Sequence, residues 1–469
     1  MALTIEQHPL YTLNPVGQEV IFTVLDAATV GAKFNVKYVA EVHISATDIN
    51  LSVTTHLVGT FKTTPNNTGA GMYDFRPILE SFVSPDNLAA LGSSYKGDAT
   101  TAIKTHPLHL VDKYSLNDNV VRYLKIRFTI EGSDTATGIV APISGEEKDS
   151  SQYTLINGYL KYTDIQDRDA TGNFGYNLDD FEIGTNQKKF LTNAPTIQYA
   201  NGGDYGTLSY LTLSAVMAAK GYSAKFKFYN SSGVLKGTDN FTRTLANGAY
   251  NTWTSDTKNQ LLHLGCFPAN LRYSSATFIA LYDAGDLDGG YYTVQLLSDA
   301  VFEDPTTQTY TININCPTLK GFEPIRLTWL NQWGVWDYYT FTMKSTKTIS
   351  TKGSTYEQLA GTWNESIYSP SGFRGGKKAF RVNATEKIKM NTDFVNESES
   401  QWFEELINSP EVYILDVFQP DPTTPLLSTY VTPARLTTSS YTRKTVANDK
   451  LMQYTFEVEK SKTLRTQSV

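Results

Sequence analysis

The clearest alternation of hydrophobic and polar residues in the chain lies within residues 325–344. Ile325, Leu327 and Trp329 alternate with polar residues, and the same period of two returns at Tyr339 and Phe341 after a short segment that contains glycine. A period of two on both sides of a short break predicts a β-hairpin with one buried face. Three of the six tryptophans fall in this hairpin, so we expect it to start the core of the last domain.

Similar alternation predicts strands along the rest of the chain, at residues 34–44, 51–62, 124–131, 154–162, 190–199, 208–216, 224–228, 277–282, 291–297, 309–316, 379–390, 412–417 and 452–458. One amphipathic helix is predicted after Asn396. Asn396 and Glu399 have the spacing of a capping box, Trp402 and Leu406 share a face, and Pro410 follows the end.

Many short strands separated by turn residues predict a mainly β protein with several antiparallel β-sandwich-like domains in tandem and a few short helices. The polar segment 141–151 is expected to form turns and to hold the first boundary, and Pro317 and Pro324 mark the second. The predicted domains are an N-terminal β domain at 1–150, a middle β-sandwich at 151–317 and an aromatic-rich C-terminal β domain with one helix at 318–469.

Composition narrows the classes of function. The 469 residues carry a net charge of −7, which leaves no basic excess to neutralise a nucleic-acid backbone. The start of the chain has no signal-like pattern and no apolar run reaches the length of a membrane span, so we expect a soluble protein made in a cytoplasm. Two cysteines cannot build a disulfide scaffold or a cysteine metal cluster.

Two acidic loops are weak calcium candidates. Asp167 and Asp169 fall at the first and third positions of a calcium-loop pattern, but the twelfth position is Leu178 instead of glutamate. The second loop holds Asp283, Asp286 and Asp288 with three glycines. Aspartate and glycine also dominate ordinary turns, so the prediction is no cofactor, with calcium as the alternative.

No motif in the sequence indicates catalysis. His106 and His109 could share a metal, but no carboxylate or cysteine is near them in sequence. His263 and Cys266 would need a third, orienting group to act as a nucleophilic pair, and a buried histidine beside a buried thiol is the simpler interpretation. The expectation is a protein that is not an enzyme.

Exposed aromatic residues indicate contact with partners. Tyr291 and Tyr292, like Tyr338 and Tyr339, are neighbours on a strand, so one of each pair faces away from its own core. Outward tyrosines are common in interfaces. The candidate interface residues are Trp333, Trp336, Tyr338, Tyr291 and Tyr292.

The run WLNQWGVWDYYTFTMKS, the later run FRGGKKAFRVNATEKIKMNTDFVNESESQWFEELINSPEVYIL and the N-terminal runs KFNVKYVAEVHI and GMYDFRPILESFV resemble virion structural proteins of tailed bacteriophages that infect Bacteroidota, including crAss-like phages. KKFLTNAP fits the middle of the same proteins. The resemblance rests on aromatic and turn patterning and not on a chemical motif. It implies a structural subunit of a tail, collar or baseplate ring, and it supplies no catalytic residues.

We therefore expect a non-enzymatic virion subunit that is assembled in the host cytoplasm. Its partners would be copies of itself in a ring and other tail or portal-proximal proteins, with no membrane and no sequence-specific nucleic-acid contact. A carbohydrate-binding adhesin or tail-fibre-type receptor-binding protein is the alternative, and it predicts an aromatic platform that faces solvent.

Overall fold

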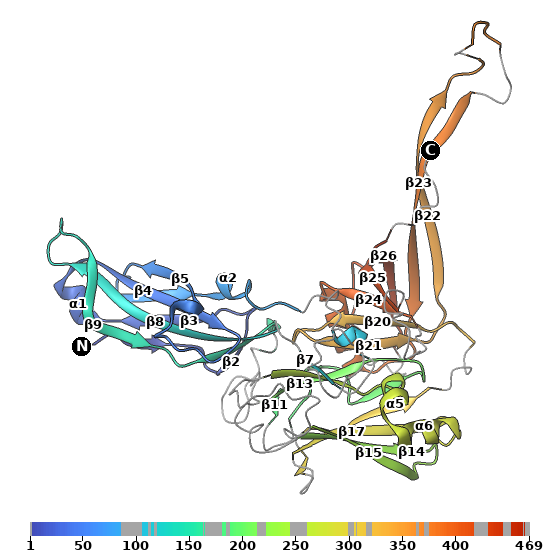
Figure 1. Cartoon of the computed structure of the whole chain (residues 1–469), viewed down its shortest axis with the longest axis horizontal. Coiled ribbons are helices and arrows are strands. Elements are labelled where there is room, and N and C mark those ends of the chain that lie inside the picture. The colour runs from blue at the N-terminus through green and yellow to red at the C-terminus, as the bar shows by residue number, and fades with distance from the viewer. Residues whose placement is uncertain are drawn as a thin grey trace. The chain divides into compact units, whose positions relative to one another are not determined.

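The computed structural model describes most of the chain and divides it into two compact units (Figure 1). Unit 1 comprises Met1–Cys316 together with Leu330–Asp337, and unit 2 comprises Pro317–Trp329 with Tyr338–Val469. The described residues are 2–85, 106–110, 114–116, 120–162, 164, 181–183, 188–212, 222–243, 260–298, 304–305, 307–315, 321–362, 365–369, 375–416, 430–443, 452–462 and 464.

Unit 1 begins with two sheets. The three-stranded sheet has the order β1-β3-β6, and the larger sheet has the order β2-β10-β8-β4-β5, with β9 also paired to β8. The elements are β1 Thr4–Gln7, β2 Leu13–Pro15, β3 Ile21–Leu25, α1 Ala27–Ala32, β4 Phe34–Ser45, η1 Thr54–His56, β5 Leu57–Thr63, β6 Ala70–Asp74, α2 Arg76–Leu79, β8 Val121–Ser133, β9 Ala141–Asp149 and β10 Tyr153–Ile156.

These two sheets pack face to face, because alternate residues of each contribute to one core. Phe22 of β3 lies 5.7 Å from Phe128 of β8 and 5.6 Å from Tyr153 of β10, measured between ring centroids. Tyr38 of β4 is buried in the same core, and its hydroxyl donates to the Gly69 carbonyl at 2.7 Å. Aromatic rings bury the largest area per residue, so this cluster holds the sandwich together.

The second pair of sheets in unit 1 has the orders β11-β13-β16-β7 and β12-β19-β17-β14-β15, with β18 also paired to β17. Strand β7 precedes β8 in the chain but pairs with β16. The elements are η2 Pro107–His109, β7 Tyr114–Leu116, β11 Glu182–Ile183, β12 Ile197–Ala200, β13 Thr207–Thr212, β14 Tyr222–Tyr229, β15 Leu235–Arg243, β16 Gln260–Gly265, α5 Pro268–Ser274, α6 Ala276–Asp283, β17 Tyr291–Ser298, β18 Asp304–Pro305 and β19 Tyr310–Ile314.

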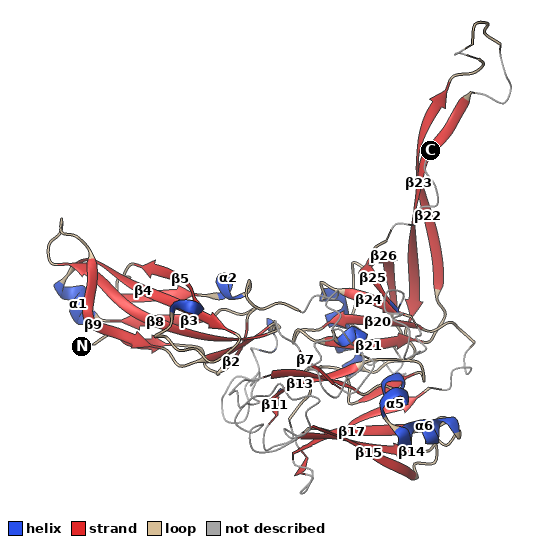
Figure 2. Cartoon of the chain, in the orientation of Figure 1, coloured by secondary structure: helices blue, strands red, loops and turns tan. Residues whose placement is uncertain are grey.

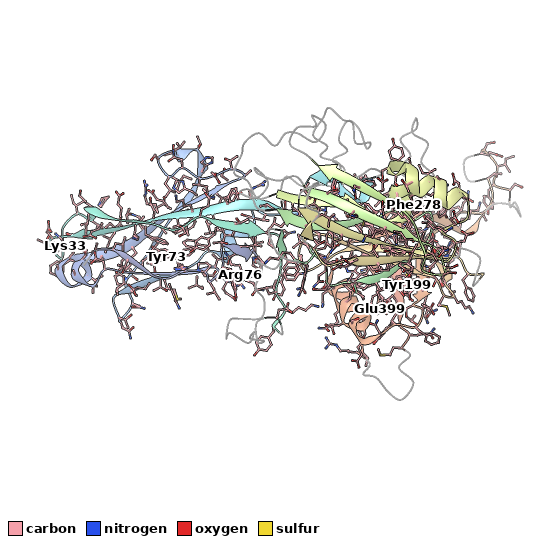
Figure 3. All side chains as sticks on the ribbon, turned by 90° about the horizontal axis from the view of Figure 1, so that it is seen from below. Lys33, Tyr73, Arg76, Tyr199, Phe278 and Glu399 are labelled. Atoms are coloured by element: carbon pink, nitrogen blue, oxygen red, sulfur yellow. The ribbon has the colours of Figure 1, made fainter. Side chains whose placement is uncertain are left out.

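Residues 276–283 form helix α6, so the predicted strand at 277–282 is wrong. The Ser275 side chain caps the helix by accepting a hydrogen bond from the Phe278 N–H at 3.0 Å. Phe278 then packs on the sheet, 5.5 Å from Phe228 and 5.8 Å from Tyr292 (Figure 3). A short segment that is apolar throughout has no period that distinguishes a helix from a strand. Here the burial of one large ring favours the helix.

The turn of the hairpin predicted at 325–344 belongs to unit 1. The buried Asn331 side chain accepts from the Trp333 and Val335 N–H groups at 2.9 and 3.2 Å and donates to the Leu191 carbonyl at 2.9 Å. Gly334 has a φ of +74°, and a Cβ there would lie 1.9 Å from the Asn157 carbonyl oxygen, so only glycine fits.

Unit 2 contains a seven-stranded sheet with the order β21-β20-β24-β25-β26-β23-β22, and helix α7 packs on one face of it. The elements are β20 Ile325–Leu330, β21 Trp336–Phe341, β22 Thr346–Gln358, β23 Gly376–Asn391, α7 Glu397–Asn408, β24 Val412–Leu415, β25 Val431–Leu436 and β26 Thr455–Lys460. The predicted helix is confirmed with its capping box between Asn396 and Glu399. Trp402 and Phe403 of α7 lie 4.9 Å from Trp329 and 5.4 Å from Phe456.

The predicted fold class is confirmed, since strands dominate (Figure 2) and most strand pairs are antiparallel, with parallel pairs at β2–β10, β11–β13 and β12–β19. A second local expectation is wrong. Residues 141–149 of the segment expected to form turns are strand β9, held against β8. The division into three domains stays a prediction. Among the described helices, none combines the length and the apolar character that a membrane span requires.

The Asn331→Ala variant should lower the free energy of unfolding of unit 1 by about 2–4 kcal/mol, because two buried N–H groups and one buried carbonyl lose their partner. Urea unfolding followed by circular dichroism measures this. Asn230 is the matched control, since it caps the more exposed turn of another hairpin with the same two local bonds, to Ser232 and Val234. Asn230→Ala should cost less than about 1 kcal/mol. Equal losses would contradict the role of Asn331.

Candidate assembly surface

The most exposed structure in unit 2 is a long β-ribbon that we name the arm: strands β22 and β23 with the described residues between them (Figure 1). Its ladder runs from Thr346 opposite Lys389 to Gln358 opposite Gly376, with a bulge at Ser354 and Thr355. All but the last residue of β22 are exposed. Strand β22 is also the edge of the sheet, so its outer backbone groups have no strand partner among the described residues.

The two faces of the arm differ, because one of them carries aliphatic side chains beside Lys347 and Glu386. Opposed residues of an antiparallel ladder point to the same side, and sides alternate along each strand. Ile349, Val382 and Ala384 therefore lie on the side of Ile388, which is buried in the sheet. Away from the sheet the same row is open to solvent, and Ile349 is 62% exposed. Exposed apolar residues that continue a core row indicate a contact surface.

The residues at the far end of the arm add to this surface. Leu359, Ile367 and Tyr368 are exposed, and Ile367 is 77% exposed. The Thr362 hydroxyl holds the loop by donating to the Ile367 carbonyl at 2.8 Å and accepting from the Ser369 N–H at 2.8 Å. The apolar side chains are thus presented by an ordered turn.

Charge on the arm is compensated only near its base. Lys347 pairs with Glu323 at 2.8 Å, and Lys387 pairs with Glu457 at 3.3 Å. Farther out, the exposed basic residues form no ion pair among the residues that the structure describes; these are Lys352, Lys377, Lys378 and Arg381. The outer half of the arm therefore carries these four basic residues beside two acidic ones, Glu357 opposite Lys377 in the ladder and Glu365 at the far end.

Three of the predicted interface residues lie in or beside the hairpin turn and are buried: Trp333, Trp336 and Tyr338. Trp333 packs 4.5 Å from Phe181, and Trp336 lies 5.4 Å from His106. Their side chains contact this chain, so they offer little surface to another one. Their role in an interface stays a prediction, and the more exposed arm was missed because β22 has too few apolar residues to show a period.

Tyr291 and Tyr292 face opposite sides of β17, as the alternation predicts. Tyr292 is fully buried and donates to the Cys266 carbonyl at 2.7 Å. Tyr291 is half-buried on the outer face and stacks on Tyr229 at 4.8 Å. Strand pairing extends this outer row across five strands, as Tyr199, Asn313, Tyr291, Tyr229 and Leu235. Tyr199 is 58% exposed (Figure 3).

The calcium candidates divide into two groups. Asp167 and Asp169 lie outside the described residues. Asp283 and Asp288 are exposed near the end of α6, and Asp286 pairs with Lys236 at 2.9 Å. Among the described residues no three histidine, cysteine or acidic side chains are grouped as metal ligands. The lysine competes with a cation for Asp286, so the fit to calcium is poor.

The buried histidines of unit 1 are placed as core residues. The Ser209 hydroxyl lies 2.7 Å from His263 Nδ1, on the opposed strand, and both side chains are buried. Burial lowers the pKa of His263 to about 3. Burial, then the nearby His109 and His263, lowers the pKa of His106 to about 3. Both rings are therefore neutral in the folded chain at neutral pH.

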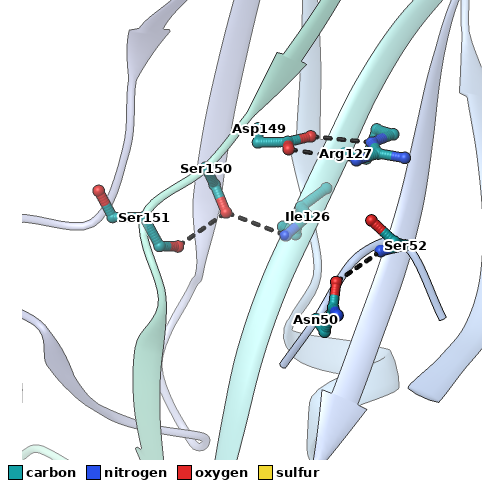
Figure 4. Close-up of polar contacts among 7 residues, drawn as sticks. All are labelled: Asn50, Ser52, Ile126, Arg127, Asp149, Ser150 and Ser151. Carbon is teal, nitrogen blue, oxygen red and sulfur yellow. Dashed lines mark hydrogen bonds and ion pairs between the residues drawn. The ribbon is translucent and has the colours of Figure 1, made fainter. Parts of the chain in front are cut away.

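Strand β9 forms an exposed edge of unit 1. It pairs only with β8 among the described strands. Its end is fixed where Arg127 Nε donates to Asp149 at 2.9 Å and Ser150 Oγ accepts from the Ile126 N–H at 2.9 Å (Figure 4). Glu147 is exposed and forms no ion pair in the part of the chain that the structure describes. Polar residues thus occupy a free backbone edge.

Comparisons with known proteins add little. No family model matches the chain, and no curated protein matches it. Among solved structures, the native conformation of E. coli alpha-2-macroglobulin is similar at 8% sequence identity, over 82% of this chain and 21% of that chain, with a TM-score of 0.17. This chain spans about a fifth of the length of that protein. A TM-score this low carries no argument about fold or function.

Acidification should destabilise unit 1. The unfolded chain takes up protons at His106 and His263 below pH 6.5, whereas the folded chain does so only near pH 3. Each histidine should thus lower the free energy of unfolding by about 1.4 kcal/mol per pH unit below 6.5. Urea unfolding at pH 7.5 and 5.0 measures the loss. His263→Asn retains an acceptor for Ser209 and should reduce the loss, and an unchanged loss would contradict the assignment.

Proposed function

We propose that this chain is a non-enzymatic structural subunit of a bacteriophage virion, a component of a tail, collar or baseplate ring that assembles through contacts between subunits. The observation that carries the proposal is the arm. It extends from the sheet of unit 2, exposes an apolar row and bears basic residues with no described partner. An exposed two-stranded ribbon is only marginally stable alone, and its exposed apolar residues indicate a surface that a neighbouring protein covers.

Three further features support the proposal. The sheets are built from short antiparallel strands around aromatic cores, which gives rigid bodies suited to repeated contacts. Ser209 and His263, the pair closest to a catalytic arrangement, are closed inside a core. The sequence resemblance to phage virion proteins points to the same class. Partners would be copies of this chain in a ring, with other tail or portal-proximal proteins beside them.

Antibody against this chain should label intact phage particles at one fixed position on the tail axis. Mass measurement of purified particles should find the protein in a symmetric multiple, because a closed ring contains equivalent copies. Serum absorbed with the purified chain is the control for the label. A chain that is absent from washed particles, or present in irregular number, would refute the virion assignment.

The outer tyrosine row favours a second candidate, a carbohydrate-binding adhesin at the host surface. Tyr199 is the most exposed ring of the row, and Asn313 and Tyr291 follow it across the sheet. A glycan array probed with the full chain tests this function. Binding that is lost at least about tenfold in Tyr199→Ala but kept in Tyr356→Ala, on the arm, would favour the adhesin. If the chain binds no glycan on the array, the adhesin candidate is refuted.

A further inference from the structure

The arm and unit 1 carry opposite charge. Strands β22 and β23 contain seven basic and two acidic residues, a net charge of +5. Unit 1 contains 32 acidic and 22 basic residues, a net charge of −10, within a chain of −7. Opposite charges draw two surfaces together, and like charges keep apart two copies of one surface. An arm is thus attracted to the first unit of another copy and repelled by another arm.

Within unit 1, strand β9 is the most acidic of the described edge strands. It contains Glu146, Glu147 and Asp149 against the single Lys148. Like β22, it is exposed, and one of its backbone edges pairs with no other described strand. Two free strand edges of complementary charge can lie side by side, with backbone hydrogen bonds adding to the ion pairs.

We propose that the arm of one copy binds the β9 edge of unit 1 in a neighbouring copy. The exposed lysines and Arg381 of the outer arm face Glu146 and Glu147, and the apolar row of Ile349 and Val382 is covered by the neighbour. Such a contact is heterologous, since each copy offers an arm and accepts one. Heterologous contacts repeat around an axis, and they form a ring when the rotation closes and a helical filament when it does not. The inference rests on the proposed function and supplies the contact which that function needs.

Charge reversal tests the contact in the full-length chain by sedimentation velocity at low salt. Wild type should associate at about 0.05 M salt and dissociate at about 0.5 M, because screening weakens exposed charge pairs. The arm variant K377E/K378E and the strand variant E146K/E147K should each weaken association at least about tenfold. Lys377, Lys378 and Glu147 are exposed, whereas Glu146 is half-buried and accepts a hydrogen bond from the Leu3 N–H at 2.9 Å. Circular dichroism therefore checks that each variant keeps the fold.

Combining the variants separates this contact from a general charge effect. The quadruple variant K377E/K378E/E146K/E147K should associate again, because the reversed charges attract. An equimolar mixture of the two double variants should also associate, with the two chains alternating, since the native arm meets the native β9 edge and the reversed arm meets the reversed β9 edge. K37E/K227E is the matched control for the arm variant, with the same charge change at exposed lysines of unit 1, and it should associate like wild type.

A second variant removes the outer arm without touching the sheet. Replacing residues 353–382 by Asn-Gly joins Lys352 to Asn383, which are opposed in the ladder, through a two-residue turn. This leaves the bridge between Ala384 and Leu464 intact. The shortened chain should remain a monomer with the thermal stability of wild type.

Three outcomes would overturn the inference. The wild-type chain could stay monomeric at low salt, or an arm variant could associate like wild type. The third is an arm that binds DNA oligonucleotides while K377E/K378E leaves the mass of the protein assembly unchanged. Virion labelling separates this failure from failure of the proposed function. If particles are labelled but the arm variants associate like wild type, the proposed virion function stands and the proposed arm–β9 contact is refuted. If association depends on the arm but particles carry no label, the arm–β9 contact stands and the virion function is refuted.

Discussion

The account depends on the β22–β23 ladder, in which backbone hydrogen bonds hold a ribbon that has almost no core of its own. A hydrogen bond in water contributes a net of about 0.5–1.5 kcal/mol, while fixing the backbone of one residue costs about 1–2 kcal/mol. Beyond Ile388 the described side chains of the outer arm are exposed or half-buried, so they do not cover the difference. Burial of Ile349 and Val382 against a neighbour would supply it, so the ribbon is a structure that a partner completes.

Elsewhere the same chain folds around complete cores. Phe22, Phe128 and Tyr153 close the first sandwich, and Trp329, Trp402 and Phe403 join α7 to the sheet of unit 2. Asn331 fixes the hairpin turn in unit 1 by three buried hydrogen bonds. The packed sheets keep the shape of the protein, whereas the exposed basic arm is the part proposed to contact a neighbour.

The sequence predicts those elements whose burial leaves a period. The hairpin at 325–341 and helix α7 were predicted because large apolar residues alternate in the first and a capping box starts the second. The pattern predicts a strand in place of helix α6 because apolar residues lie on all sides of this segment. Strands β9 and β22 were missed because their side chains are mostly in water, where selection for a buried face does not act.

The candidate surface was hard to predict for the same physical reason. Tryptophans and tyrosines attract attention as interface residues, yet Trp333, Trp336, Tyr338 and Tyr292 are large enough to be used in the chain's own cores. The residues left for a neighbour are lysines, threonines and a few aliphatic side chains on the arm. Their common feature is the ladder that pairs β22 with β23, and pairing between distant strands is visible only after folding.

A reconstruction of the assembled protein by cryo-electron microscopy tests the central claim most directly. The account predicts a closed ring in which density for β22 and β23 of each copy lies along β9 of the next, with Lys377 and Lys378 facing Glu147. A ring whose arms point freely into solvent, or a chain that stays a monomer in every particle image, would contradict it.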